Sequence, residues 1–173
     1  MIRVKLPITR EVLRTLKAGD RLLLSGHLYT ARDAAHKRMV ETLKKGEKLP
    51  IPIIGETIYY MGPTPTPPGR VIGACGPTTS KRMDPYMESL LGEGLLVTVG
   101  KGERSEGVVR LIERYGALYL VTFGGAGAYL SQRVRSKEIV AYEDLGPEAI
   151  YRLCVEDFPA VVAIDSYGRT IFK

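Results

Sequence analysis

The chain alternates between the two hydrophobic periods that are typical of strands and helices. Residues 2–6 alternate apolar and polar side chains as a half-buried strand does, and residues 21–25 form a short apolar run typical of a buried strand. Between them, residues 9–16 have helical spacing that begins at a threonine, a residue type that caps helices. A longer helical pattern over residues 33–45 has its apolar face at Ala35, Met39, Val40 and Leu43, and a glycine follows it. The first third therefore predicts strand, helix, strand and helix.

The second half repeats this alternation. Strands are predicted at residues 71–75, 95–99 and 118–123, and helices after them at residues 81–91, at residues 105–115 and from Gly125 onward. Shorter predicted elements are extended pieces at 51–54 and 57–60, a strand at 139–141, a helix at 147–153 and a closing hairpin of 161–164 and 169–172. The Pro- and Gly-rich residues 61–69 predict a loop on the surface or over a site. This order of elements predicts an α/β fold with a partly parallel sheet.

Length and composition predict one globular domain that spans residues 1–173. The chain is 45% hydrophobic and 25% charged, which is ordinary for a globular protein, and no internal repeat or linker divides it. Its net charge of +6 and pI of about 9.3 are compatible with nucleic acid, an acidic partner or anionic substrates. Because the cations are scattered in ones and twos and the chain has no Trp, the nucleic-acid interpretation is disfavoured.

The cysteines and the N-terminal residues indicate in which cellular compartment the protein is expected. Cys75 and Cys154 lie far apart and form neither a disulfide framework nor a metal motif, and their apolar neighbours predict two buried structural thiols. Two thiols cannot ligate an iron–sulfur cluster alone. The first residues lack the apolar core of a signal peptide, and no apolar run approaches the roughly 20 residues that span a bilayer. We therefore expect a cytoplasmic protein without membrane contacts.

The segment 76–84 (GPTTSKRMD) carries the strongest chemical signal. It follows an apolar run and precedes a helical pattern, so its hydroxyl groups and cations are expected at a helix entrance, where free backbone N–H groups attract carboxylate or phosphate. The alternative is an ordinary helix cap with Arg82 in solvent. Both interpretations stay open on the local pattern alone.

Two other turns have the same predicted place after a strand. Residues 25–32 end in Arg32, and residues 100–105 place Lys101 between two glycines. Because ligands collect beyond the carboxyl ends of parallel strands, Arg32, Thr78, Arg82 and Lys101 are expected around one anion-binding crevice. The alternative for Lys101 is a solvated loop cation. The glycine-rich residues 124–128 lack the order of a phosphate-binding loop and predict close helix packing instead.

Several separated segments together resemble one family. They are Gly19-Asp20, Ser25-Gly26, residues 32–38 (RDAAHKR), residues 60–63 (YMGP), residues 76–84, Lys101-Gly102 and residues 155–160 (VEDFPA). In this order they resemble the beta subunit of the iron–sulfur hydro-lyases, the class I fumarases and L-tartrate dehydratases. The resemblance extends over residues 19–172, almost the whole chain.

The resemblance implies a single swivelling domain of the β/β/α type. In this family such a domain closes over a four-iron four-sulfur (4Fe-4S) cluster that three cysteines of a separate alpha part hold, so a cysteine-rich alpha subunit is the expected partner. The cluster is accordingly expected on that partner, and no metal site is expected in this chain. Two copies of each chain are the family expectation.

The resemblance also assigns roles to the residues of the crevice. Arg32, Arg82 and Lys101 are expected to bind substrate carboxylates, because arginine can hold a carboxylate through two parallel N–H bonds. Thr78 is the expected base, with Arg82 near enough to support its alkoxide; alternatively, Thr78 is a cap that only positions the substrate. Thr79 and Ser80 are expected to be caps, and His36 is expected to make a structural hydrogen bond.

The expected reaction is the reversible hydration of fumarate to (S)-malate, with a dicarboxylate as substrate. Dehydration of L-tartrate is the alternative within the same family. Two interpretations of another kind stay open beside it, a non-catalytic anion-binding module and a basic nucleic-acid protein. Neither of them explains why so many family segments recur in order.

Overall fold

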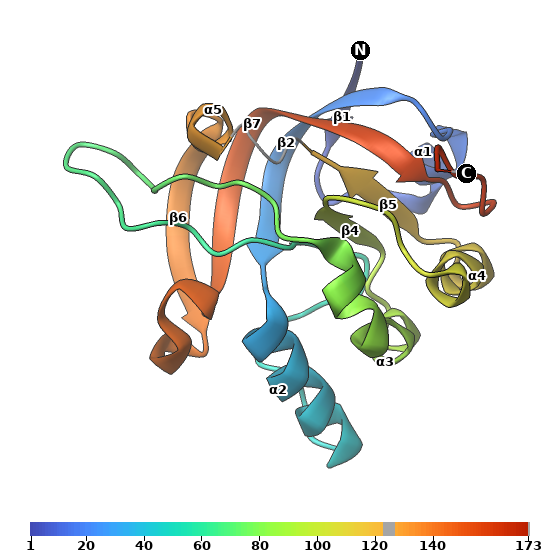
Figure 1. Cartoon of the computed structure of the whole chain (residues 1–173), viewed down its shortest axis with the longest axis horizontal. Helices are drawn as coiled ribbons and strands as arrows, with labels where there is room; N and C mark the ends of the chain where they lie inside the picture. Colours follow the sequence, from blue (N-terminus) through green and yellow to red (C-terminus); the bar gives the residue numbers. More distant parts are fainter. Residues whose placement is uncertain (123–126, 173) are drawn as a thin grey trace.

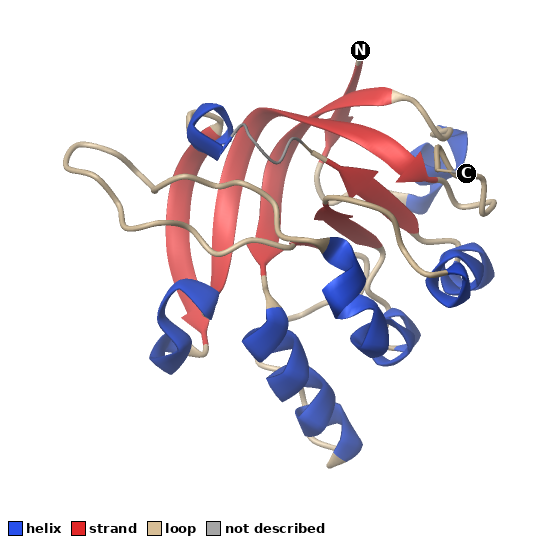
Figure 2. Ribbon diagram, in the orientation of Figure 1, coloured by secondary structure: helices blue, strands red, loops and turns tan. Residues whose placement is uncertain are grey.

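The computed structural model describes residues 1–122 and 127–172 and has the predicted α/β architecture (Figures 1 and 2). The strands are β1 (Ile2–Lys5), β2 (Arg21–Thr30), β3 (Thr57–Tyr59), β4 (Val97–Gly100), β5 (Leu118–Val121), β6 (Val134–Ala141) and β7 (Ile150–Ile164). The α-helices are α1 (Arg10–Thr15), α2 (Asp33–Lys44), α3 (Met87–Gly92), α4 (Glu106–Tyr115) and α5 (Gly127–Ser131), and the 3-10 helices are η1 (Ser80–Tyr86) and η2 (Glu143–Glu148).

The described strands form one seven-stranded sheet that closes on itself. Its order is β1-β2-β3-β4-β5-β7-β6, and β7 also pairs with β2. Strands β1 to β5 pair in parallel, whereas β7 runs antiparallel to β2, β5 and β6. The partly parallel sheet is therefore confirmed, and strands β2, β3, β4, β5 and β7 form a closed ring.

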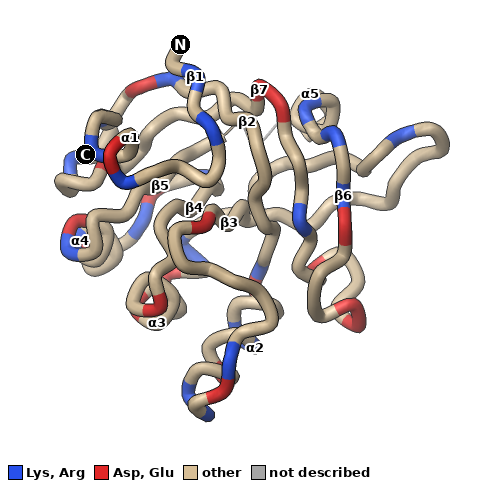
Figure 3. The backbone as a smooth tube through the Cα atoms, turned by 180° about the vertical axis from the view of Figure 1, so that it is seen from behind, with Lys and Arg blue, Asp and Glu red and all other residues tan. Residues whose placement is uncertain are grey.

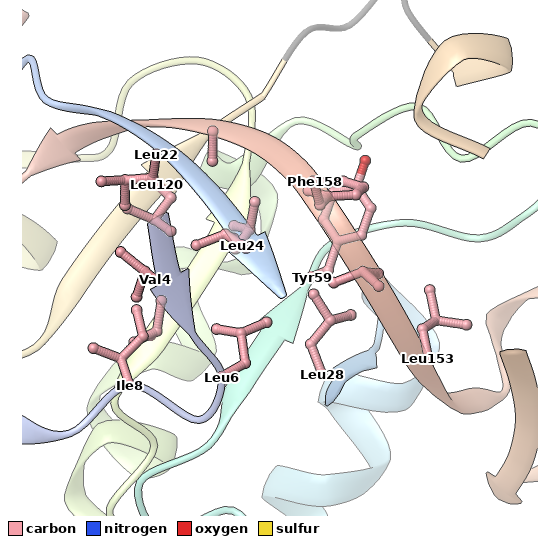
Figure 4. Close-up of a cluster of buried hydrophobic side chains, with 14 of the residues drawn as sticks. Val4, Leu6, Ile8, Leu22, Leu24, Leu28, Tyr59, Leu120, Leu153 and Phe158 are labelled. Atoms are coloured by element: carbon pink, nitrogen blue, oxygen red, sulfur yellow. The ribbon is translucent and has the colours of Figure 1, made fainter. Parts of the chain in front are cut away.

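A hydrophobic core fills the inside of this ring (Figure 4). Because side chains alternate along a strand, Leu28 and Tyr59 join this core. Their chain neighbours Tyr29 and Ile58 join a second core instead. The rings of Tyr59 and Phe158 meet edge to face, with their centroids 5.3 Å apart. Both rings are fully buried, so they anchor β3 to β7 across the ring.

The second core lies between the outside of the sheet and helices α2, α3 and α4, which gather on one side in Figure 1. Helix α4 shows how local sequence specifies this layer. Ser105 accepts a hydrogen bond from the N–H of Val108, Gly116 ends the helix in the left-handed conformation (φ 64°), and Val108 and Ile112 are buried. The predicted helices at 33–45 and 105–115 are both confirmed within one residue.

Two predicted elements are wrong, and a third is confirmed in altered form. Residues 71–75 form no strand. They pair instead with the preceding loop, where the N–H of Thr64 donates to the carbonyl of Ala74 and Gly73 lies close to the carbonyl of Thr64. The predicted helix 81–91 is confirmed as helical, but it is divided into the 3-10 helix η1, which contains Pro85, and the α-helix α3. Residues 147–153 form the end of η2 and the start of β7, whose apolar and polar residues alternate with the period of a strand.

Other predicted bounds change. Residues 51–54 are not a strand, and β2 continues five residues beyond the predicted end at Ser25. The C-terminal hairpin is confirmed only in part: residues 161–164 are the end of β7, but residues 169–172 form no strand and meet β7 through an isolated bridge between Ile164 and Thr170. The predicted end of one strand at Phe123 and most of the glycine-rich segment 124–128 lie outside the described residues. Gly127 packs closely on residues 74–76, as predicted, since a Cβ atom there would lie 3.0 Å from the Gly76 nitrogen.

The predicted loop 61–69 is confirmed and belongs to a long excursion over residues 61–77 without helix or strand. In Figure 1 it is the arm that extends away from the helices and past β6. The hydroxyl of Thr66 accepts a hydrogen bond from the Lys137 ammonium on β6 at 2.8 Å. The excursion leaves the body of the protein directly after β3 and returns to it at Thr78.

Candidate functional site

The segments that follow β2, β3 and β4 lie side by side at one edge of the sheet. The N–H of Ala31 donates to the carbonyl of Tyr59 at 3.1 Å, and the N–H of Tyr60 donates to the carbonyl of Val99 at 2.8 Å. The parallel pairing therefore continues past the ends of the strands. As a result, Arg32 and Lys101 lie on either side of the segment that leaves β3.

Thr78 reaches this edge by a route that differs from the prediction. It does not follow a strand of its own; instead its N–H donates to the carbonyl of Tyr60 at 2.7 Å. Two residues on, the N–H of Ser80 donates to the carbonyl of Lys101 at 3.0 Å, and Thr79 bridges to Lys101 in parallel. The structure thus brings the Thr78 segment to Lys101 through the backbone.

Glycine makes one of these approaches possible. A Cβ atom at Gly100 would collide with the hydroxyl of Ser80, so the end of β4 can lie against the Ser80 side chain only because residue 100 has no side chain of its own. Gly62 has a similar role for Arg32. A Cβ atom there would lie 2.8 Å from the Pro147 carbonyl oxygen and 3.1 Å from Cδ of Arg32.

Asp33 joins the two predicted arginines. Its carboxylate accepts hydrogen bonds from Nε of Arg82 at 3.2 Å and from Nη2 of Arg82 at 3.3 Å, and Nη2 of Arg32 lies 3.8 Å away. Sequence reasoning missed Asp33, although an acidic residue at a helix N-terminus beside a predicted anion-binding arginine was a usable signal. All three side chains are between 30% and 50% exposed, so the ion pairs add little stability.

His36 makes the expected structural hydrogen bond. The side chain is fully buried on α2, and its Nδ1 donates to the carbonyl of Arg32 at 2.8 Å. Because a carbonyl can only accept, this bond fixes the tautomer with an unprotonated Nε2, which has no partner among the described residues. Burial lowers the pKa of His36 to about 4.

This pKa gives a testable pH dependence. Between pH 6.5 and about 4 the unfolded chain binds a proton at His36 and the folded chain does not, so stability falls as pH falls through this window. The expected loss at the acid end is about 3 kcal/mol of unfolding free energy. Urea unfolding between pH 7 and pH 4 measures it.

The matched variant is His36→Asn, whose amide nitrogen keeps a donor near the Arg32 carbonyl. The carboxylates titrate in both proteins, so the difference between the two pH slopes isolates His36. We expect the variant to have the shallower slope. Equal slopes would show that His36 does not lose its proton on folding.

Ser80 is not a helix cap, contrary to the prediction, and Thr79 makes no capping bond with its side chain. The hydroxyl of Ser80 is buried and lies 2.7 Å from that of Tyr119, which also lies 2.6 Å from the carbonyl of Gly102. The reason is that η1 turns this side chain toward the sheet. Ser80 therefore connects the Thr78 segment to β5.

The two cysteines do not fit an iron–sulfur site. Cys75 is buried as predicted, its thiol lies 3.2 Å from the Gly73 carbonyl, and burial raises its pKa to about 12. Cys154 is exposed, contrary to the prediction, because it alternates with the buried residues Leu153 and Val155 on β7. Within residues 1–122 and 127–172, no three His, Cys, Asp or Glu side chains gather as metal ligands would.

Charge is distributed without a continuous basic track in the view of Figure 3. Lys and Arg residues alternate with Asp and Glu residues along the tube, including along α2. The scattered pattern predicted from the sequence is therefore also seen in space. Among the described residues, no helix has the length and apolar character needed to cross a membrane.

The sequence profile of the family described as "Fumarase C-terminus" matches residues 1–173. "Fumarate hydratase class I, aerobic" of Escherichia coli (strain K12) is 40% identical over 169 residues, which cover 95% of this chain and 31% of that protein. "Fumarate hydratase 1, mitochondrial" of Leishmania major is 38% identical over 178 residues, which cover 100% of this chain and 32% of that protein.

A shorter relative matches over most of its own length. "Putative L(+)-tartrate dehydratase subunit beta" of Methanocaldococcus jannaschii is 37% identical over 172 residues, which cover 96% of this chain and 88% of that protein. This chain therefore spans about a third of the length of the fumarate hydratases it matches and nearly the whole of a beta subunit.

Proposed function

Because this chain belongs to the Fumarase C-terminus family, we propose that it is the substrate-binding beta part of a hydro-lyase that acts on a dicarboxylate. One observation carries the proposal. The segments that contain Arg32, Thr78 and Lys101 lie together at the carboxyl edge of β2, β3 and β4, and Arg82 is tied to the same edge through Asp33.

In this proposal, Arg32, Arg82 and Lys101 bind the carboxylates of the substrate. Arg82 already holds a carboxylate, that of Asp33, through two of its nitrogens. This contact supports the proposed role, since the same guanidinium is half exposed and so is within reach of a second carboxylate. Lys101 is exposed and adds a point charge beside the Thr78 segment.

Thr78 is proposed as the residue that takes the proton from the substrate carbon. Its backbone is fixed by the hydrogen bond to Tyr60, and its side chain is half-buried, so the hydroxyl starts from a defined position. Formation of an alkoxide needs nearby positive charge, which Arg82, four residues after Thr78, and Lys101, paired with the backbone next to Thr78, would supply. The alternative, in which Thr78 only positions the substrate, predicts a smaller effect on the proton-transfer step.

A cysteine-rich alpha subunit is the proposed partner, and it would hold the 4Fe-4S cluster that this chain's cysteines do not fit. The word "beta" in the name of the archaeal relative supports such a partner. The cluster would supply a Lewis acid for the substrate hydroxyl. We further propose that this domain swivels onto the alpha subunit in the cytoplasm and that the complex contains two copies of each chain.

Fumarate is the proposed substrate, and its hydration gives (S)-malate. L-Tartrate is the second candidate, because the relative that matches over most of its own length is named a tartrate dehydratase subunit. Both are four-carbon diacids, so the same three cations serve either one.

The test is reconstitution. The chain and a cysteine-rich alpha chain encoded with it are purified together without oxygen and assayed with fumarate, malate and both tartrates. We expect hydratase activity from the complex and none from this chain alone. Activity of the chain alone would contradict the division of roles, and an inactive complex with an intact cluster would favour a non-catalytic anion-binding module.

A further inference from the structure

We propose that Arg104 is a positioning residue, which fixes Lys101 and the Thr78 segment relative to each other. This inference rests on the proposed function, because it assigns a role in the same site. It is argued, however, from the contacts of Arg104, a residue to which the proposed function assigns no role. The Arg104 side chain is 0% exposed, although arginine side chains are rarely buried.

Arg104 forms a buried ion pair with Asp84. Its Nε donates to Oδ1 of Asp84 at 2.7 Å, and Oδ2 of Asp84 accepts the backbone N–H of Ser105 at 2.8 Å. Asp84 lies on η1, two residues after Arg82, and Ser105 ends the segment that contains Lys101. The pair therefore joins the segments that carry Arg82 and Lys101, two of the three proposed carboxylate ligands.

A second nitrogen of Arg104 contacts β4 and the residue that follows β3, whereas Nη2 has no partner among the described residues. Nη1 donates to the hydroxyl of Tyr60 at 3.2 Å and to that of Thr98 on β4 at 3.4 Å. Tyr60 is the residue whose carbonyl holds the Thr78 N–H. The guanidinium also lies over the rings of Tyr60 and Tyr119, 5.2 Å and 4.9 Å from their centroids.

Tyr119 provides a second connection between the same segments. Its hydroxyl has one proton, and the Gly102 carbonyl can only accept, so Tyr119 donates to Gly102 and accepts from the Ser80 hydroxyl. Gly102 follows Lys101, and Ser80 follows Thr79. Arg104 and Tyr119 thus belong to two connections between the same segments, and the Arg104 guanidinium lies over the Tyr119 ring.

The energetics of buried ion pairs favour a positioning role, rather than a stabilising one, for the Arg104 charge. A buried ion pair is often replaceable by apolar side chains without loss of stability, so stability alone does not require Arg104. Burial lowers the pKa of Arg104, but Tyr60 and Asp84 offset this effect and leave the pKa above its ordinary value. The side chain therefore stays charged and keeps all its hydrogen-bond donors.

The experiment compares Arg104→Gln and Tyr119→Phe with the wild type in the reconstituted complex. The second variant keeps the aromatic ring and removes only the hydroxyl, so it folds if the first does not. We expect kcat/KM to fall at least about thirtyfold in Arg104→Gln and about tenfold in Tyr119→Phe, with a raised KM, since small misplacements of binding groups are costly. Arg110→Gln, an exposed position on α4, is the matched control and should keep wild-type kinetics.

A second readout needs no activity. Amide hydrogen exchange of this chain is expected to speed up at least about tenfold in residues 78–82 and 101–105 of both variants, with β1 and β2 unchanged. Unchanged exchange in those two segments, or an even rise over the whole chain, would overturn the positioning role. An inactive wild-type complex would refute the proposed function instead, and the exchange result would still decide the role of Arg104.

Discussion

Replacing Thr78 with alanine is expected to lower the turnover number of the reconstituted complex at least about a hundredfold. Removal of a group that transfers a proton in the transition state typically costs a hundredfold to ten-thousandfold in rate. The backbone hydrogen bond from Thr78 to Tyr60 does not involve the side chain, so the variant should assemble normally. Steady-state kinetics with malate and size-exclusion chromatography measure the two effects.

Two further variants sharpen this prediction. Thr79→Ala changes an exposed neighbour whose side chain makes no capping bond, and it should keep near-normal turnover. Arg82→Ala removes a proposed carboxylate ligand and should match Thr78→Ala in severity. Near-normal rates from both Thr78→Ala and Arg82→Ala would show that the active site does not lie at this edge of the sheet.

Replacing Phe158 with alanine is expected to lower the free energy of unfolding of the chain by about 3 to 5 kcal/mol. Phe158 is fully buried inside the ring of strands, and its ring meets that of Tyr59 (Figure 4). A truncated aromatic side chain loses its transfer free energy and leaves a cavity that close-packed neighbours fill only in part. Urea unfolding followed by circular dichroism measures the change.

Ile54→Ala is the matched control, because Ile54 is 82% exposed. Its unfolding free energy should stay within about 0.5 kcal/mol of the wild-type value. A loss of less than about 1.5 kcal/mol in Phe158→Ala would mean that the inside of the ring is not packed as described.

The helices that the sequence predicted well are those with complete local signals. Helix α4 has a capping serine, a strong apolar stripe and a terminal glycine, and α2 has a similar stripe before Gly46. The failures lie where long-range contacts override local preference. Residues 71–75 are apolar enough for a strand, yet they pair with the loop around Thr64 and contribute Ile72 and Cys75 to the core.

The part of β7 before residue 161 was missed for another reason. Its first residues begin after a proline and two residues with good helix propensity, which suggested a helix at 147–153. The alternation of buried and exposed side chains from Tyr151 onward is a strand signal, and a count over eight or more residues would have detected it. Because β7 supplies three of the pairings, the closed ring could not be predicted without it.

The prediction that the segments after β2 and β4 lie close together came from a rule of sheet topology and not from any one motif. Parallel strands end at the same edge, so residues after β2 and β4 were predicted to lie together. Asp33 and Arg104 were missed because their importance depends on partners 49 and 20 residues away in sequence. Only the folded chain makes such pairs visible.

The closed ring of strands has a consequence for folding during synthesis on the ribosome. Strand β7 is synthesised after every strand with which it pairs, and it alone closes the ring between β2 and β5. Until residues 150–164 emerge, the nascent chain exposes two unprotected sheet edges to neighbouring polypeptides and chaperones. Closure of the ring is therefore a late event of biosynthesis, set by the order of its strands in the chain.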